Sequence, residues 1–436
     1  MSAPSSSRIA SLDGQLAGEV FWSVALAAVI YFFALVFMRP TFIKANPDFS
    51  CFYRAGRMVA TGHGAQVYDL SAQRRFDAML RPDITTAGHR MFTMPFVFAP
   101  SSLVIFAPLS LLPYRAADLI WSALNIFLLI ATSLFFSHQL HLSRAATCLT
   151  VICPALAWPA IFALIHGQVS VLMSALLAVA FSRLLSGLDF QAGCWLAMAA
   201  LKPQFIAVAV IAMIAARNWA AIRGFLSVSA ALAIASCGLI GWRAVINYPK
   251  TILSYAALPA NAAGTLGKEV PAVMPNLRGL LYHIVGSQRV RTFALLAGTM
   301  LCLVMLWIAA RTADKIAAFT VSLLVMQLVS FHGGFYDLVL LLPLGPVFAA
   351  RRRKSSLLVF ASLLFVPLLG TIERMALGYC ILLLVLLLLE MLLISESKGA
   401  HRETHVQVPP AAGDAGSTSG RCFLTKAHRE FTIWQV

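Results

Sequence analysis

The chain has 436 residues, of which 60% are hydrophobic and 11% are charged, whereas a soluble domain carries roughly a quarter of charged residues. The formal net charge is +16, but the basic residues are scattered over loops and form no basic-aromatic face, which argues against a nucleic-acid partner. Apolar runs of about 20 residues, the length of a bilayer-spanning helix, recur between Phe21 and Ile394, so the composition excludes a soluble protein and predicts an all-α polytopic membrane protein.

The first apolar run, Val20 to Met38, predicts the first membrane span. It is too long for the apolar region of a signal peptide and contains no small-residue cleavage site, so residues 1–19 are expected to be cytoplasmic. Two later runs are interrupted by proline, and we therefore expect ten to twelve spans. Twelve apolar segments follow one another along the chain: 20–38, 96–113, 116–138, 145–165, 168–186, 190–215, 224–242, 292–310, 316–331, 334–350, 355–372 and 375–394.

The first long polar region contains the stretch PDFSCFYRAGRMVATGHGAQVYD, residues 47–69. Within it, apolar residues that include Tyr53 recur at helical spacing, and Arg54 and Arg57 fall on the opposite side. This pattern predicts a short amphipathic helix at the membrane surface. All three named side chains are candidates for a substrate cavity there, and the two arginines are candidates for contact with anionic lipid.

Asp48 directly precedes this predicted helix. Aspartate is a favoured N-cap residue, so the first interpretation is structural. A carboxylate held at the membrane surface can also act as a general base. The two interpretations are compatible, because a capping interaction holds a side chain in place.

Two apolar segments are interrupted near membrane depth. Pro154 and Pro159 break one of them, and the pair Lys202 and Pro203 breaks the other. Proline removes a helical hydrogen bond. Because broken helices at membrane depth are tolerated where they are buried in protein or line a wet cavity, we expect both segments to be kinked or re-entrant.

The motifs HGQVS and LKPQ accompany these breaks, and each pairs a cation-capable residue with glutamine. The residues concerned are His166 with Gln168 and Lys202 with Gln204. A lone charge at mid-bilayer costs about 2.5–3.5 kcal/mol on insertion scales. Lys202 lies too near the middle of its segment to reach the interface easily, so a buried anion such as a phosphate is its expected partner.

Two further motifs lie where predicted spans meet the outside. FHGGFYD brings His332, Tyr336 and Asp337 together beside a Gly-Gly break, and such a polar cluster at a span end predicts a lined cavity. In the second long polar region, MPNLRGL contains Arg278, which can grip a phosphate with two hydrogen bonds. Arg278 is equally interpretable as a solvated loop residue.

The orientation follows from the short basic loops, because lysine and arginine mark the cytoplasmic side. RRRK at 351–354 and the loops around Arg311 and Arg217 are therefore placed inside. The two long loops, 39–95 and 243–291, then lie outside. The first of them carries eight basic residues, which an anionic ligand would explain.

The remaining segments and motifs restrict the metals, disulfides and group donors that the protein can use. The tail, 395–436, contains PPAAGDAGSTSG and is predicted to be a disordered cytoplasmic segment. The eight cysteines form no CxxC pair, so neither disulfides nor a metal site is expected. The chain has no P-loop, no GxGxxG after a strand, no HExxH and no GxSxG. A group donor must therefore be lipid-borne or small.

The ordered set of motifs resembles glycosyltransferase family 87, once grouped as a family of unknown function. Its best-known members resemble polyprenol-phosphate-mannose-dependent α-1,2-mannosyltransferases. The resemblance covers roughly residues 20–390 and starts with an aspartate in the first outside loop, followed by a helix with Tyr and Ala-Gly. The further stretches that carry it, in order, are FAPSSLVIFAPLSLLP (98–113), HGQVSVL (166–172), AGCWLAMAALKPQF (192–205) and SFHGGFYDLVLLLP (330–343).

The resemblance implies a GT-C fold with the active site at the outer leaflet. It implies an inverting transfer of a hexose, with mannose expected, from a polyprenyl-phosphate donor to a glycolipid or cell-envelope glycan. Asp48 matches the family's base, and no cofactor or metal is required. Arg278, Lys202 and His332 are the candidates for binding the donor phosphate. The candidates for lining the substrate cavity are Tyr53, Arg54, Arg57, His166, Gln168, Gln204, Tyr336 and Asp337.

The working hypothesis is thus a multi-pass glycosyltransferase of the inner membrane, residues 20–394, with a periplasmic active site and membrane lipids as neighbours. A secondary transporter is the first alternative, although the two halves of the chain show no repeat of hydropathy, which that class often has. A non-catalytic protein that binds polyprenyl lipids is the second alternative. Transfer of sugar by the purified protein distinguishes the three.

Overall fold

The computed structural model describes residues 6–42, 48–84, 94–256 and 270–406. Every regular element in these ranges is a helix, which confirms the prediction of an all-α protein. The chain divides into a compact unit, Met1–Ile394, and a C-terminal segment, Ser395–Val436.

All twelve predicted apolar segments are mostly helical. The N-terminal half contains α1 (Ser6–Phe33), η1 (Ala34–Met38), α2 (Arg39–Phe42), α3 (Phe49–Ala60), η2 (Gly64–Gln66), α4 (Leu70–Ile84), η3 (Pro100–Ser102), α5 (Leu103–Leu109), α6 (Tyr114–Gln139), α7 (Arg144–Leu156), α8 (Trp158–His166), α9 (Ser170–Leu185), α10 (Asp189–Met198) and α11 (Pro203–Ala215). The C-terminal half contains α12 (Trp219–Ile240), α13 (Trp242–Ala256), η5 (Val270–Val273), α15 (Leu277–Ile284), α16 (Gln288–Ala310), α17 (Lys315–Val329), η6 (Phe335–Leu341), α18 (Leu344–Ala350), α19 (Lys354–Ser362), η7 (Leu363–Leu369) and α20 (Ile372–Val406).

Within the described residues, five helices are long and apolar enough to cross a membrane, and the pair α7 and α8 makes a sixth if it is counted as one broken span. Six shorter apolar helices have 10–17 residues each. The exposed sides of the long helices carry large apolar side chains such as Leu119, Ile234 and Phe293, as expected for faces that contact lipid. The five long spans are Gly18–Met38, Tyr114–Gln139, Trp219–Ile240, Gln288–Ala310 and Ile372–Glu396.

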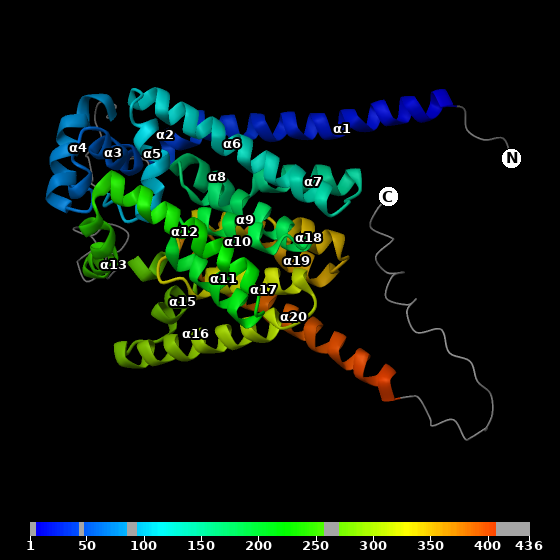
Figure 1. Ribbon diagram of the computed structural model, residues 1–436. Helices are drawn as coiled ribbons and strands as arrows, with labels where there is room; N and C mark the ends of the chain where they lie inside the picture. The colour runs from blue at the N-terminus through cyan, green and yellow to red at the C-terminus, as the bar shows by residue number, and fades with distance from the viewer. Residues whose placement is uncertain (1–5, 43–47, 85–93, 257–269, 407–436) are drawn as a thin grey trace, which may run out of the picture. The chain divides into compact units, whose positions relative to one another are not determined.

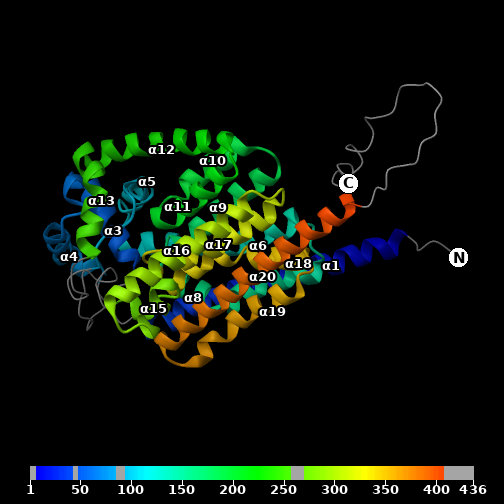
Figure 2. The same ribbon diagram turned by 90° about the horizontal axis from the view of Figure 1, so that it is seen from below.

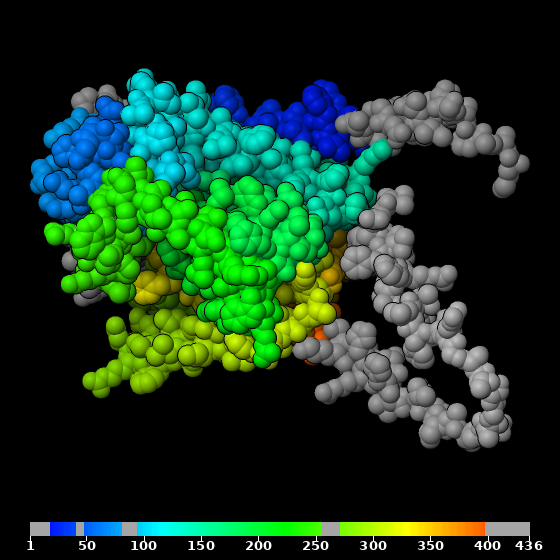
Figure 3. Space-filling view, in the orientation of Figure 1, coloured from blue at the N-terminus to red at the C-terminus, as the bar shows by residue number. Residues whose placement is uncertain are grey.

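The helices of the compact unit pack side by side as a bundle. Helix α1 packs along α7 and α6, α10 packs against both α9 and α12, and α16 packs on α17. Figures 1 and 2 show the helices of the two long loops, namely α3, α4, α13 and α15, at the same end of this bundle. The space-filling view shows the α3–α4 and α13 regions side by side at that end (Figure 3). The described helices of both long loops therefore lie at one end of the bundle (Figures 1 and 2).

Both predicted breaks are present. The α7–α8 pair is bent by 56°, with Ala157 extended between the two helices and Pro159 in the first turn of α8, where a missing N–H has no cost. The second break separates the end of α10 at Met198 from Pro203, which opens α11. The backbone of Lys202 is extended at this break, so its side chain projects from the N-terminal end of α11.

Helix α20 continues to Val406, into the segment predicted to be disordered. The prediction is wrong for residues 395–406, because they include Glu, Lys and Arg, which are good helix formers and extend the preceding helix. The rest of the predicted tail lies outside the described residues.

Candidate active site

Helix α3 packs inside the protein. Its residues from Phe49 to Gly56 are all buried, and Phe52 stacks on Phe106 of α5 with ring centroids 4.6 Å apart. A Cβ atom at Gly56 would lie 2.2 Å from the Phe106 carbonyl oxygen, so the glycine allows α3 to approach α5. The predicted helix is confirmed, and α4 and α5 pack against it.

Gly56→Ala is expected to destabilise the protein by about 1–3 kcal/mol, the usual cost of overpacking a core. The added methyl group must push α3 away from the α5 backbone. The measurement is the melting temperature of the detergent-solubilised protein. Gly238→Ala in α12 is the matched control, because no atom lies within 4 Å of a Cβ there and alanine is the better helix former. Equal melting temperatures for Gly56→Ala and the wild type would contradict this close packing.

Arg54 is buried in the protein with an exposed fraction of 1%. Its guanidinium pairs with Asp77 of α4 at 2.6 Å and donates hydrogen bonds to Gln73 Oε1 at 2.9 Å and to the Met94 carbonyl oxygen. The prediction that Arg54 contacts lipid or substrate is therefore wrong. The arginine opposite the apolar side of α3 thus forms a buried ion pair with α4. The spacing of residues within α3 could not show that α4 covers this side.

Asp48 lies at the N-cap position of α3, but its side chain accepts no hydrogen bond from that helix. The carboxylate is 3% exposed. Its Oδ2 atom accepts a hydrogen bond from Gln168 Nε2 and lies 3.6 Å from His166 Nδ1. Its Oδ1 atom is buried and has no hydrogen-bond partner among the described residues. The capping prediction for the side chain is therefore wrong, and the carboxylate is held from another part of the fold.

The motif HGQ turns sharply at the end of α8. Gly167 adopts the left-handed conformation, with φ 67°, which glycine adopts without strain. A Cβ atom there would lie 2.8 Å from Phe49 Cβ, and Trp121 Nε1 donates a hydrogen bond to the Gly167 carbonyl oxygen at 2.8 Å. The turn thus places both His166 and Gln168 beside Asp48.

A second cluster surrounds Lys202. Its Nζ atom lies 2.5 Å from Asp337 Oδ1 and 3.0 Å from Ser170 Oγ, and Ser170 also donates to Asp337. The backbone N–H of Gly334 donates to the other Asp337 oxygen at 2.9 Å. Asp337 is fully buried and its oxygens are occupied, so the prediction that it lines a substrate cavity is wrong. Lys202 has a protein carboxylate as its partner, where the sequence predicted a phosphate.

Tyr336 joins the two clusters. The Lys202 ammonium lies 4.6 Å from the centre of its ring, and the His166 ring centroid lies 6.0 Å away on the Asp48 side. The rings of Phe162 and Tyr336 stack at 6.3 Å. His166, Gln168 and Tyr336 thus lie around Asp48.

The loop 330–334 is clasped by the second long loop. Arg278 donates a hydrogen bond to the Phe331 carbonyl oxygen at 3.0 Å and its guanidinium lies 4.2 Å from the centre of that ring. Asn276 donates to the Ser330 carbonyl oxygen at 2.9 Å, and Gln204 donates to that of His332 at 3.2 Å. Asn276 and Ser170 were not predicted as site residues, although each lies inside a motif that the sequence singled out.

His332 is neutral at physiological pH. Burial lowers its pKa to about 4, with Asp337 opposing and Lys202 and Arg278 reinforcing the shift. Its Nδ1 atom has no hydrogen-bond partner in the described part of the chain. His332 therefore offers no positive charge to a phosphate, but its neutral ring can still donate one hydrogen bond.

The protein is expected to lose stability as the pH falls from 6.5 towards 4. The folded-state pKa of His332 lies below its ordinary value of 6.5, so its contribution is complete above pH 6.5 and is lost as protonation favours the unfolded chain. The melting temperatures of the wild type and His332→Gln over this pH range measure the effect. An identical pH dependence in both proteins would contradict the assignment.

Two predicted cavity residues have structural contacts. The Tyr53 hydroxyl donates to the Leu112 carbonyl oxygen at 2.8 Å, and Tyr53 is buried. Arg57 donates to the Ser110 carbonyl oxygen at 3.3 Å. Both hydrogen bonds hold α3 against the segment between α5 and α6. These contacts account for the two side chains without a ligand.

The chain's potential metal ligands do not gather within the described residues. No group of three or more His, Cys, Asp or Glu side chains is placed there to hold a metal ion. The seven described cysteines are free thiols, and Cys422 lies outside the described residues.

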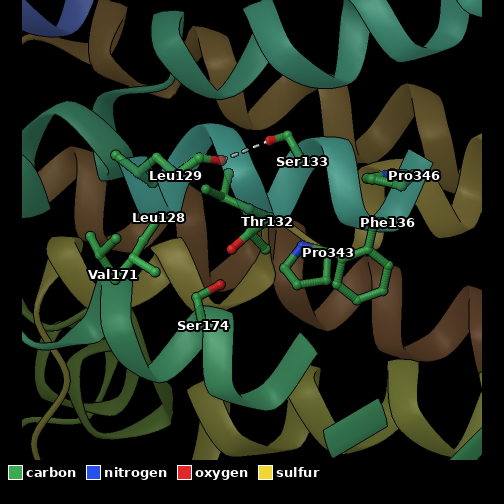
Figure 4. A pocket seen from close by; sticks show the side chains of 10 residues that line it. Leu128, Leu129, Thr132, Ser133, Phe136, Val171, Ser174, Pro343 and Pro346 are labelled. Atoms are coloured by element: carbon green, nitrogen blue, oxygen red, sulfur yellow. Dashed lines mark hydrogen bonds between the residues drawn. The ribbon is translucent and has the colours of Figure 1, made fainter. Parts of the chain in front are cut away.

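Two cavities border the helices that carry Ser170 and Asp337. The one in Figure 4 is lined by α6, α9 and the start of α18 and measures about 10 Å³, which is below what a sugar needs. Ser133 donates to the Leu129 carbonyl oxygen at 3.1 Å beside it. The other measures about 300 Å³ and is lined mostly by apolar residues of α7, η6, α18 and α19, among them Leu338, the residue after Asp337.

The model of glycosyltransferase family 87 matches residues 96–331, which is just over half of the chain. No curated protein and no solved structure matches this chain. The matched range contains His166, Gln168, Lys202 and Arg278, whereas Asp48 precedes it.

Proposed function

Because the chain belongs to glycosyltransferase family 87, we propose that it transfers a hexose, mannose being expected, from a polyprenyl phosphate to a hydroxyl group of a glycolipid or cell-envelope glycan, with inversion at the anomeric carbon. Family membership makes the protein a glycosyltransferase and sets aside the secondary transporter and the non-catalytic lipid-binding protein. The donor, the acceptor and the stereochemistry are the parts that the proposal adds.

The observation that carries the proposal is the buried Asp48 carboxylate. Gln168 fixes one of its oxygens, and the other has no hydrogen-bond partner among the described residues. An unpaired buried carboxylate oxygen is costly, and an acceptor hydroxyl would satisfy it. As that hydroxyl attacks the anomeric carbon, Asp48 takes its proton and the bond between the anomeric carbon and the phosphate oxygen breaks.

The leaving phosphate keeps the bonding electron pair and needs no strong acid. It needs preorganised hydrogen-bond donors or positive charge. Arg278 and the neutral ring of His332 are the proposed groups, because His332 belongs to the clasped loop beside the Asp48 cluster and Arg278 holds that loop. Lys202 is paired with Asp337, and its proposed role is to position Tyr336 and the loop.

The lipid part of the donor is supported by the apolar cavity of about 300 Å³. Leu338, the residue after Asp337, lines it together with residues of α18, and α7 forms a wall from Ala146 to Pro154. A prenyl chain is apolar and would contact such a wall without leaving polar groups unpaired. No nucleotide-binding motif occurs in the sequence, in keeping with a lipid-borne sugar.

The placement of the site on the outer, periplasmic side of an inner membrane is supported by the short basic loops. Helix α17 ends at the loop that contains His332 and begins at Lys315, which lies 3.9 Å from Asp189. Beside it, Arg351 pairs with Asp314 at 2.6 Å. The basic loops thus gather at the end opposite the Asp48 cluster, and basic loops favour the cytoplasmic side.

The test is an incubation of the purified protein with polyprenyl-phosphate mannose and a crude membrane lipid extract, followed by mass spectrometry. The proposal expects lipids that have gained one hexose, together with released polyprenyl phosphate. Donor binding without transfer would contradict the catalytic proposal. Transfer from a nucleotide sugar but not from the lipid donor would contradict the proposed donor.

A further inference from the structure

A large cavity lies at the opposite end of the bundle from Asp48. It measures about 840 Å³ and opens where α9, α11 and α16 end and where α10, α12 and α17 begin. Helices α9, α11 and α17 each have one end at the candidate active site and the other end at this cavity. The mouth of the cavity is therefore separated from the candidate active site by the length of α17, about 22 Å at 1.5 Å per residue.

The mouth of the cavity is positively charged. Arg217, Arg311 and Lys315 line it, with Asp189 as the acidic residue among the lining side chains. The Arg311 guanidinium lies 5.0 Å from the centre of the Trp307 ring, and Lys315 donates a hydrogen bond to the Leu184 carbonyl oxygen at 2.7 Å. Because Lys315 lies 3.9 Å from Asp189, the two arginines supply the excess positive charge that favours an anion at the mouth.

The wall of the cavity is apolar and deep. It extends along α17 from Lys315 to Met326, about 16 Å at 1.5 Å per residue. That depth is about half of the 30 Å hydrocarbon core of a bilayer, which is the length available to an acyl chain of one leaflet. Small side chains of α11, among them Ala209 and Ala212, leave this space between α9 and α17.

We propose that this cavity binds one anionic phospholipid from the leaflet at that end. Its phosphate contacts the three cations at the mouth, and one acyl chain lies between α9, α11 and α17. Apolar contact alone does not select a lipid from the bilayer, because acyl chains are as apolar as the cavity wall. The head-group charge therefore provides the selectivity, at about fivefold in affinity for each cation near the phosphate.

The test is native mass spectrometry of the delipidated full-length protein with phosphatidylglycerol or phosphatidylcholine of equal chain length. Phosphatidylglycerol is expected to bind as a single copy and at least tenfold more tightly. Arg217→Asn combined with Arg311→Gln is expected to remove about 25-fold of that affinity; asparagine is chosen because residue 217 has a positive φ of 54°. Arg243→Gln is the matched control, because this arginine also lies over a tryptophan ring, at 5.5 Å.

A second variant alters the apolar wall and leaves the charge of the mouth unchanged. Ala212→Trp fills the cavity and is expected to abolish the binding of phosphatidylglycerol while leaving the melting temperature close to that of the wild type. Equal binding of the two phospholipids, or unchanged binding in both variants, would overturn the proposal. Full displacement of phosphatidylglycerol by inorganic phosphate would also overturn it, since it would reveal an anion site without an acyl-chain groove.

Discussion

Asp48→Asn is expected to lower the rate of sugar transfer by about 10²–10⁴-fold, the usual contribution of a general base. Asparagine keeps the shape of the side chain and can still accept the hydrogen bond from Gln168, but it cannot take a proton from the acceptor. Donor binding is therefore expected to stay unchanged. The measurement is the initial rate at saturating donor, together with the affinity for the donor.

Asp69→Asn is the matched control for this variant. Asp69 lies in the same loop, is exposed, and accepts hydrogen bonds from Ser71 and the Ala72 backbone. Asparagine is an equally good cap, so transfer should proceed at the wild-type rate. Wild-type transfer by Asp48→Asn as well would assign the base to another residue.

Lys202→Met is expected to lower stability by about 3–5 kcal/mol and to abolish transfer. The substitution leaves the fully buried Asp337 carboxylate without its cation, and an uncompensated buried charge carries a cost of that size. Because Asp337 also accepts the Gly334 N–H, the loop with His332 is expected to lose its position. Melting temperature and initial rate are the two measurements.

The double variant Lys202→Met with Asp337→Asn separates charge from packing. It removes both charges and keeps an acceptor for the Gly334 N–H, so it should recover most of the lost stability. Lys354→Met, at an exposed position, is the control for the loss of a lysine and should be neutral. A Lys202→Met protein as stable as the wild type would contradict the buried ion pair.

The helical segments were predictable because hydrophobic runs and helix breakers are local features. Pro159 and Pro203 each open a helix, and both breaks predicted from the prolines are present. The helical end of α20 was not predicted, because a polar segment without strong helix breakers was interpreted as disordered.

The partners of the site residues were not predictable, because they come from distant parts of the chain. Asp48 and Gln168 are 120 residues apart, and Lys202 and Asp337 are 135 apart. Each residue was singled out by its unusual chemistry in an apolar setting. Which carboxylate pairs with the lysine, and which remains partly unpaired, depends on how the broken helices pack.

Arg54 illustrates the limit of periodicity. An arginine opposite an apolar stripe indicates a solvent-facing side, but α4 covers that side and supplies Asp77 and Gln73. Only the three-dimensional packing distinguishes a buried ion pair from a lipid contact. The glycine in the same helix, Gly56, carries the better signal, because a helical glycine often permits close packing.

The most direct test of the central claim is the anomeric configuration of the product formed by the purified protein from a polyprenyl-phosphate hexose of known configuration. Nuclear magnetic resonance with an isotopically labelled sugar compares the donor and the product. A single displacement in which Asp48 deprotonates the acceptor predicts an inverted anomeric carbon. A product with retained configuration would contradict the account.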